Sequence, residues 1–158
     1  MEPGARPVRK RLRLDLQLYG QPDRVCSITM AVKGRQPVFE HPQLATAVVK
    51  LLEDLAAEHG IPVYAYCVMP DHVHLVVSAS ASCDILTFVG RFKSLALRAA
   101  WSQGIRGTFW QRSFWDHFVR DDEDLAQVIG YVLANPVRAG LVDEPSAYAF
   151  SGSLTPVR

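Results

Sequence analysis

The sequence lacks a long uninterrupted apolar run and has few cysteines. None of its segments approaches the roughly 18 consecutive apolar residues that a membrane-spanning helix requires, so we expect no membrane partner. Hydrophobic residues make up 49% of the 158 residues and charged residues 21%, which is typical of a globular protein rather than a disordered one. A chain of this length can bury a core as one domain without disulfides.

The three cysteines, Cys26, Cys67 and Cys83, are widely spaced and form no paired-cysteine motif. This pattern indicates reduced thiols in a cytosol. The first residues are basic, but no apolar stretch with a small-residue cleavage site follows them, so the sequence shows no secretory signal. We therefore expect a cytoplasmic protein.

The net charge of +1 excludes little, because the basic residues are clustered. Residues 1–23 are interpreted as a basic N-terminal arm, and residues 24–158 as a single domain. Between Asp84 and Asp116 basic residues alternate with aromatic ones and no acid intervenes. Cations bind phosphates and flat rings stack on unpaired bases, so the pattern favours single-stranded nucleic acid, although a solvated helix face over an aromatic core is the alternative. The candidate DNA-binding residues are Arg9, Lys10, Arg11, Arg13, Arg91, Arg98 and Arg112.

Runs of β-branched and aromatic residues predict the strands. They are residues 24–32, 62–69, the histidine segment that follows the turn Pro70-Asp71, and an irregular strand within 109–120. Residues 62–69 and the histidine segment should form an antiparallel hairpin. A strict polar/leucine alternation over residues 11–18 is interpreted as an edge strand or an arm.

Helical spacing of apolar residues predicts three helices. The first begins at Pro42 and ends at Gly60, the second is capped by Asp84, and the last runs from about Asp122 to Ala134 before Pro136 stops it. The order β-α-β-β-α-β, followed by a helix, indicates an α+β fold, namely a ferredoxin-like antiparallel sheet with helices packed on one face and a C-terminal helix that carries Tyr131.

The segment VMPDHVHLVV places two histidines in an apolar strand. Side chains alternate along a strand, so His72, His74 and Val76 share one face. Two neighbouring imidazoles can chelate a metal ion, but two ligands alone do not hold a catalytic ion. The polar face of a half-solvated strand is the alternative.

The last predicted helix places Asn135 one turn after Tyr131, so a hydroxyl and an amide project from the same face. From this spacing alone, a packed amphipathic tyrosine is the more ordinary interpretation than a nucleophile.

Three segments, MPDHVHLVV, WQRSFWDHFVRDDEDL and YVLANPVRAGLV, resemble the single-tyrosine transposases of the HUH nuclease superfamily, and most closely the REP-associated tyrosine transposase branch. The resemblance covers about residues 24–151. It implies an enzyme, a metal-dependent single-stranded DNA endonuclease and strand transferase that forms a 5′-phosphotyrosine intermediate beside a REP-like hairpin.

The resemblance also implies residue roles. His72 and His74 would be metal ligands for Mg²⁺ or Mn²⁺, Tyr131 the nucleophile, and Asn135 a third ligand or merely a helix cap. Asp71 stands where many relatives have asparagine. The role of Asp116 and His117, two further residues of uncertain function, is open between structural support and a part in the active site.

The implied partner is single-stranded DNA with hairpins, bound by a monomer or a homodimer associated with a bacterial nucleoid. Tyrosine suits the chemistry, because a phenolate leaves more readily than an alkoxide and the phosphotyrosine bond can be reversed by a 3′ hydroxyl. Two other functions remain open. One is a domesticated hairpin-binding protein with little cleavage, and the other is a hydrolase with Zn²⁺ at the two histidines.

Overall fold

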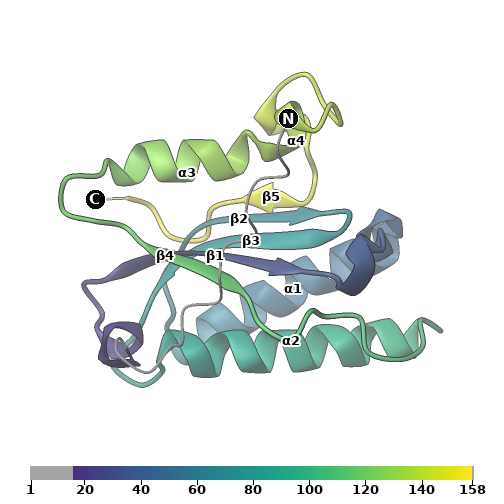
Figure 1. The fold of residues 1–158 in the computed structure, drawn as a ribbon, viewed down its shortest axis with the longest axis horizontal. Helices are drawn as coiled ribbons and strands as arrows, with labels where there is room; N and C mark the ends of the chain where they lie inside the picture. Colours follow the sequence, from purple (N-terminus) through teal and green to yellow (C-terminus); the bar gives the residue numbers. More distant parts are fainter. Residues whose placement is uncertain (1–15, 158) are drawn as a thin grey trace.

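A five-stranded antiparallel sheet in the order β4-β1-β3-β2-β5 forms the centre of the molecule (Figure 1). The computed structural model describes residues 16–157. The strands are β1 Val25–Ala31, β2 Val63–Met69, β3 His72–Ser78, β4 Trp115–Phe118 and β5 Ser151–Gly152. The two central strands β1 and β3 pair over their full lengths, so the histidine strand is held rigidly from both sides.

The helices lie on both faces of this sheet (Figure 1). One face is covered by α1 and α2, and the opposite face by α3, with α4 directly after it. Their bounds are α1 Pro42–His59, α2 Ile85–Ser102, α3 Leu125–Leu133 and α4 Asn135–Arg138. The α+β fold with an antiparallel sheet and α1 and α2 on one face confirms the prediction, and α3 on the other face adds a placement that the sequence order does not specify.

Local sequence signals explain the bounds of the two longest helices. Pro42 occupies the first turn of α1, where a missing N–H costs nothing, and Gly60 ends the helix in the left-handed conformation with φ of 65°. Asp84 caps α2, because its Oδ1 accepts the Thr87 N–H at 2.7 Å. α1 therefore begins and ends where the sequence predicts, and α2 begins at the predicted cap.

Alternation along the strands divides the apolar residues into two layers. Ile28, Val73 and Leu75 point toward α1 and α2 and are fully buried with Phe88 in the main core. A smaller cluster on the other face consists of Ala65, Cys67, Met69, Val76 and Val132. The main core therefore supplies most of the burial, while α3 rests on a thin apolar layer.

The structure corrects two expectations at the ends of the chain. Residues 16–18 are not a strand but part of the 3₁₀ helix Leu16–Gly20, which buries Tyr19 against Phe118 at a centroid distance of 5.0 Å. Residues 11–15 of that alternating segment lie outside the described residues. The last helix begins at Leu125 rather than at about 122, because Asp124 is the residue that accepts the Ala126 N–H, at 2.8 Å.

As expected, the last predicted helix ends before Pro136, because α3 stops at Leu133. Pro136 itself lies in the first turn of a second, short helix, α4, in which the Arg138 N–H donates to Ala134 O at 3.0 Å. Asn135 and Arg138 therefore follow Tyr131 on nearly consecutive turns.

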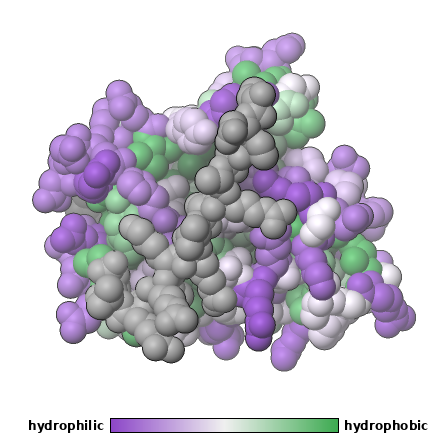
Figure 2. Space-filling view, viewed as in Figure 1, coloured by the Kyte–Doolittle hydropathy of each residue, from purple (hydrophilic) through white to green (hydrophobic). Residues whose placement is uncertain are grey.

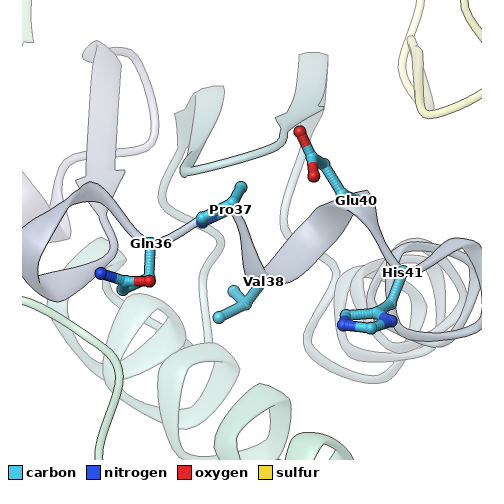
Figure 3. A pocket seen from close by; sticks show the side chains of 5 residues that line it. All are labelled: Gln36, Pro37, Val38, Glu40 and His41. Atoms are coloured by element: carbon cyan, nitrogen blue, oxygen red, sulfur yellow. The ribbon is translucent and has the colours of Figure 1, made fainter.

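The connection between β1 and α1 braces the β2–β3 turn. It contains the 3₁₀ helices Lys33–Arg35 and Val38–Glu40. A separate 3₁₀ helix, Pro145–Ala147, lies near the C-terminus. The Phe39 N–H donates to Pro70 O at 3.0 Å and the Val32 N–H to Asp71 O at 2.9 Å. Side chains of this connection line a hollow beside α1 (Figure 3), and they are Gln36, Pro37, Val38, Glu40 and His41.

On the face seen in Figure 2, hydrophobic residues form small patches among hydrophilic ones. Within residues 16–157, no helix has the length and apolar character needed to cross a membrane.

Candidate active site

His72 and His74 lie on the face of β3 that α3 and α4 overlie. Strand alternation directs their neighbours Val73 and Leu75 into the main core, and Val76, on the histidine side, packs with Val132 of α3. The His72 side chain is 14% exposed. The sheet therefore presents both imidazoles in one half-buried position, as the spacing predicts.

The ring of His72 is oriented by Asp71. His72 Nδ1 lies 2.6 Å from Asp71 Oδ1, and because a carboxylate only accepts hydrogen bonds, Nδ1 carries the proton and Nε2 carries the lone pair. Arg35 Nε lies 3.8 Å from the other Asp71 oxygen and holds the carboxylate in place. Burial lowers the pKa of His72 below 6.5, against the opposing effect of Asp71, so the ring is neutral near pH 7.

His74 is held by Thr29 of β1, its direct partner across the sheet. Thr29 Oγ1 lies 2.9 Å from His74 Nδ1, and a hydroxyl can donate or accept, so it supports either tautomer of the ring. Burial, followed by the nearby His72, Arg138 and Arg35, lowers the pKa of His74 to about 4. His74 is therefore neutral over the physiological pH range.

The two Nε2 atoms face each other at 3.0 Å. Because Asp71 fixes His72 Nε2 as an acceptor, His74 Nε2 must donate a proton across this contact in the metal-free protein. A cation between the rings would replace that proton, and His74 Nδ1–H would then donate to Thr29. The two Nε2 atoms would hold such a cation, because imidazole nitrogens bind divalent transition-metal ions.

Asn135, the first residue of α4, brings a third polar side chain to the two histidines. Its Nδ2 lies 3.2 Å from His72 Nε2, and a rotation of the amide would bring Oδ1, a metal-binding oxygen, to the same place. Within residues 16–157, no three His, Cys, Asp or Glu side chains form a group that could hold a metal. The donors present are thus two imidazoles and one amide, which fit a divalent cation that keeps open positions for substrate oxygens.

Tyr131 projects from the last full turn of α3. The residue is 66% exposed, and the guanidinium of Arg138 lies over its ring with Cζ 3.8 Å from the centroid. The neighbouring Val132 is buried against the sheet, and Asn135, one turn on, contacts His72. The helix that carries the tyrosine is therefore fixed to the histidine site at its C-terminal end.

Asp116 and His117 point to opposite faces of β4. Asp116 pairs with Ile28, so it faces α1 and α2, and the Tyr19 hydroxyl donates to its Oδ2. His117 Nε2 contacts Glu123 Oε1 at 2.8 Å, which ties β4 to the loop before α3. Asp116 therefore lies across the sheet from the two histidines.

The candidate DNA-binding residues occupy separate places. Arg91 and Arg98 are exposed on α2, on the face of the sheet opposite the histidines. Arg112 is exposed next to Gln111, whose N–H donates to Ala31 O at 2.9 Å, at the end of β1 that pairs with His72. The candidates outside the described residues are Arg9, Lys10, Arg11 and Arg13.

Three residues near the histidines carry no role in the sequence-based interpretation, namely Thr29, Arg35 and Arg138. Thr29 and Arg35 reach the site through strand register and a loop, which sequence spacing does not reveal. The position of Arg138 could have been predicted, because it follows Tyr131 by seven residues, or two helical turns, and so shares a helix face with it.

Comparison with known proteins identifies the family of the chain. Residues 25–135, more than two thirds of the chain, match the family model described as "Transposase IS200 like". The chain is 27% identical over 112 residues to the REP-associated tyrosine transposase of Escherichia coli, covering 71% of this chain and 64% of that protein. It is 34% identical over 77 residues to the ISDra2 transposase TnpA of Deinococcus radiodurans, covering 47% and 54%.

Among solved structures, the fold is similar to that of a REP-associated tyrosine transposase bound to a REP hairpin, with a TM-score of 0.65, 21% identity, and coverage of 84% of this chain and 78% of that one. The chain spans 54–64% of the length of the curated relatives it matches. The matched region runs from the start of β1 to Asn135 and so includes both histidines and Tyr131. The chain belongs to the IS200-like transposase family.

Proposed function

We propose that residues 24–158 form one catalytic unit that cuts and rejoins single-stranded DNA next to a hairpin, with Tyr131 as nucleophile. The observation that carries the proposal is the convergence of His72, His74 and Asn135 beside the helix that bears Tyr131. The names of the E. coli relative and of the hairpin-bound structural neighbour support a REP-like hairpin as the substrate. A bacterial chromosome in the cytoplasm is the proposed place of action.

In the proposed reaction, Tyr131 Oη attacks the phosphorus of a DNA phosphodiester. The new Oη–P bond forms as the bond from phosphorus to the 3′ oxygen breaks, which leaves a 5′-phosphotyrosine and a free 3′ hydroxyl. The phenolic proton of the exposed Tyr131 passes to solvent, and the departing 3′ oxygen takes up a proton from solvent, so protons and charge balance. Attack by another 3′ hydroxyl reverses the step and joins the strands.

His72 and His74 hold the divalent cation in this proposal, and Asn135 contributes its amide oxygen. When bound, Mg²⁺ or Mn²⁺ would stabilise negative charge on the phosphate oxygens. Asp71 and Thr29 support this role, because they keep both rings oriented with Nε2 toward the shared position. Nitrogen ligands favour Mn²⁺ in affinity, whereas cellular abundance favours Mg²⁺.

Trp115 is the proposed stacking residue for an unpaired base. It pairs with Thr29, which pairs with His74, so all three side chains share one face, and Trp115 is 37% exposed. In contrast, Phe92 and Phe109 are buried in the core. Arg112 and the basic arm would bind phosphates near the cleaved DNA strand. Arg91 and Arg98 would bind DNA only if it passes around the sheet to the face opposite the histidines.

The test is covalent capture of a labelled single-stranded hairpin oligonucleotide. Wild-type protein with Mn²⁺ should form a denaturant-resistant adduct that EDTA prevents. Tyr131→Phe should abolish the adduct, whereas Tyr64→Phe, at a half-buried tyrosine on β2, should form it normally. An adduct that persists in Tyr131→Phe would refute the assignment.

Two further measurements distinguish a binding protein from an enzyme and test whether two subunits share one site. Hairpin binding without cleavage by wild-type protein at any Mn²⁺ or Mg²⁺ concentration would indicate a binding protein. Mixing His74→Ala with Tyr131→Phe tests the assembly, because recovery of activity requires that one subunit supplies Tyr131 to the partner's histidines.

A further inference from the structure

Arg138 stands out because it contacts the proposed nucleophile directly. It lies in the last turn of α4, and its Cζ is 3.8 Å from the centroid of the Tyr131 ring, so the planar guanidinium stacks on the aromatic face. Both side chains are exposed to solvent. This contact limits the positions that the otherwise exposed Tyr131 ring can adopt.

The helix that carries Arg138 also adjoins the histidine site. α4 packs against β2, and Asn135, its first residue, lies 3.2 Å from His72 Nε2 through its Nδ2. Arg138 is therefore on the same short helix as a side chain that contacts the proposed metal ligands.

Among residues 16–157, no carboxylate lies within ion-pair distance of Arg138, and no hydrogen bond joins its side chain to another residue. Stacking on Tyr131 uses the flat face of the guanidinium and leaves its N–H edges unused. A guanidinium edge matches two phosphate oxygens in a bidentate arrangement. An arginine with one face occupied and its donors free is suited to bind a phosphate next to the ring it holds.

We infer that Arg138 is a positioning and phosphate-binding residue, which holds the Tyr131 ring by stacking and binds the DNA phosphate that Tyr131 attacks. This inference rests on the proposed function. Arg138 fixes the distance between nucleophile and phosphate, and it neutralises the charge that builds on the phosphate oxygens. Lysine cannot replace it, because an ammonium group has neither the flat face nor the paired donors.

The experiment compares adduct formation and hairpin binding in Arg138→Ala, Arg138→Lys and the control Arg106→Ala, which removes an exposed arginine from the loop after α2. Single-turnover adduct rates with saturating Mn²⁺ and the dissociation constant of an uncleavable hairpin are measured for each. Both Arg138 variants should lose roughly 100-fold in rate, as for removal of one transition-state donor, with little change in hairpin affinity. Arg106→Ala should keep the wild-type rate.

Rescue separates this role from a structural one. Added guanidinium ion at low millimolar concentration should partly restore the rate of Arg138→Ala and leave Tyr131→Phe inactive. A wild-type rate in Arg138→Ala, full recovery in Arg138→Lys, or a loss confined to hairpin affinity would each overturn the inference. Those results would leave the proposed function standing, because that function fails only if Tyr131→Phe still forms the adduct.

Discussion

The buried histidines of β3 should make the metal-free protein sensitive to acid. The pKa of His74 is lowered from its ordinary value of 6.5 to about 4 in the folded protein, mainly by burial. Below pH 6.5 the unfolded chain binds a proton that the folded chain excludes. The free energy of unfolding therefore falls as the pH drops from about 6.5 to about 4, and it is unaffected by this group above that window.

The size of the effect follows from the two pKa values. At pH 5 the unfolded ring is almost fully protonated and the folded ring almost fully neutral, which lowers the stability by about 2 kcal/mol relative to pH 7.5. For a chain of this size, that loss corresponds to a fall in Tm of about 4–8 °C. The pKa of His72 is lowered as well, so it adds to the loss in the same direction.

Urea unfolding at pH 7.5, 6 and 5 in EDTA measures this loss, for wild-type protein and for His74→Gln. The variant should show a shallower decline, because it removes the group that titrates. His41→Gln, at an exposed histidine that precedes α1, should follow wild type. Equal declines in wild type and His74→Gln would refute the reasoning, because acid sensitivity would then arise elsewhere.

Two remaining predictions concern the supports of the site. Asp71→Ala should weaken Mn²⁺ binding by about 10–100-fold in titration calorimetry, because it frees the His72 ring, while Asp71→Asn should weaken it less since the amide oxygen still accepts from Nδ1; equal affinities in all three proteins would contradict this. Asp124→Ala should lower the free energy of unfolding by about 1 kcal/mol through loss of the α3 cap, and a change below 0.3 kcal/mol in urea unfolding would show that the cap contributes little.

Local rules were sufficient for the helices of the main core and for the face of the histidine strand. Pro42, Gly60 and Asp84 act within one turn of the backbone, so their effects are visible in the sequence. Strand alternation likewise places His72 and His74 together whatever the rest of the fold does. These features needed no knowledge of tertiary contacts.

The rest depends on register and on contacts between distant segments. The Thr29 contact with His74 spans 45 residues and exists only because β1 pairs with β3 in one register. The expected strand at residues 16–18 failed because burial of Tyr19 against β4 outweighs the local alternation. α3 ends before Pro136 as expected, but the short helix α4 that follows was not predicted, although a proline is compatible with the first turn of a new helix.

Because alternate residues of β3 face opposite layers, some positions of this strand contribute to stability and others to the chemistry of the site. Val73 and Leu75 of β3 pack in the main core, whereas His72 and His74 form the site. A conservative apolar change at Val73 or Leu75 should then alter how much folded protein a cell retains, while a change at His72 or His74 should alter what each folded molecule does. Over residues 72–75, parity along β3 thus separates core positions from site positions, whereas Val76, on the histidine side, is buried with Val132. A stabilising redesign of the α1 and α2 layer can therefore proceed without touching the reactive face.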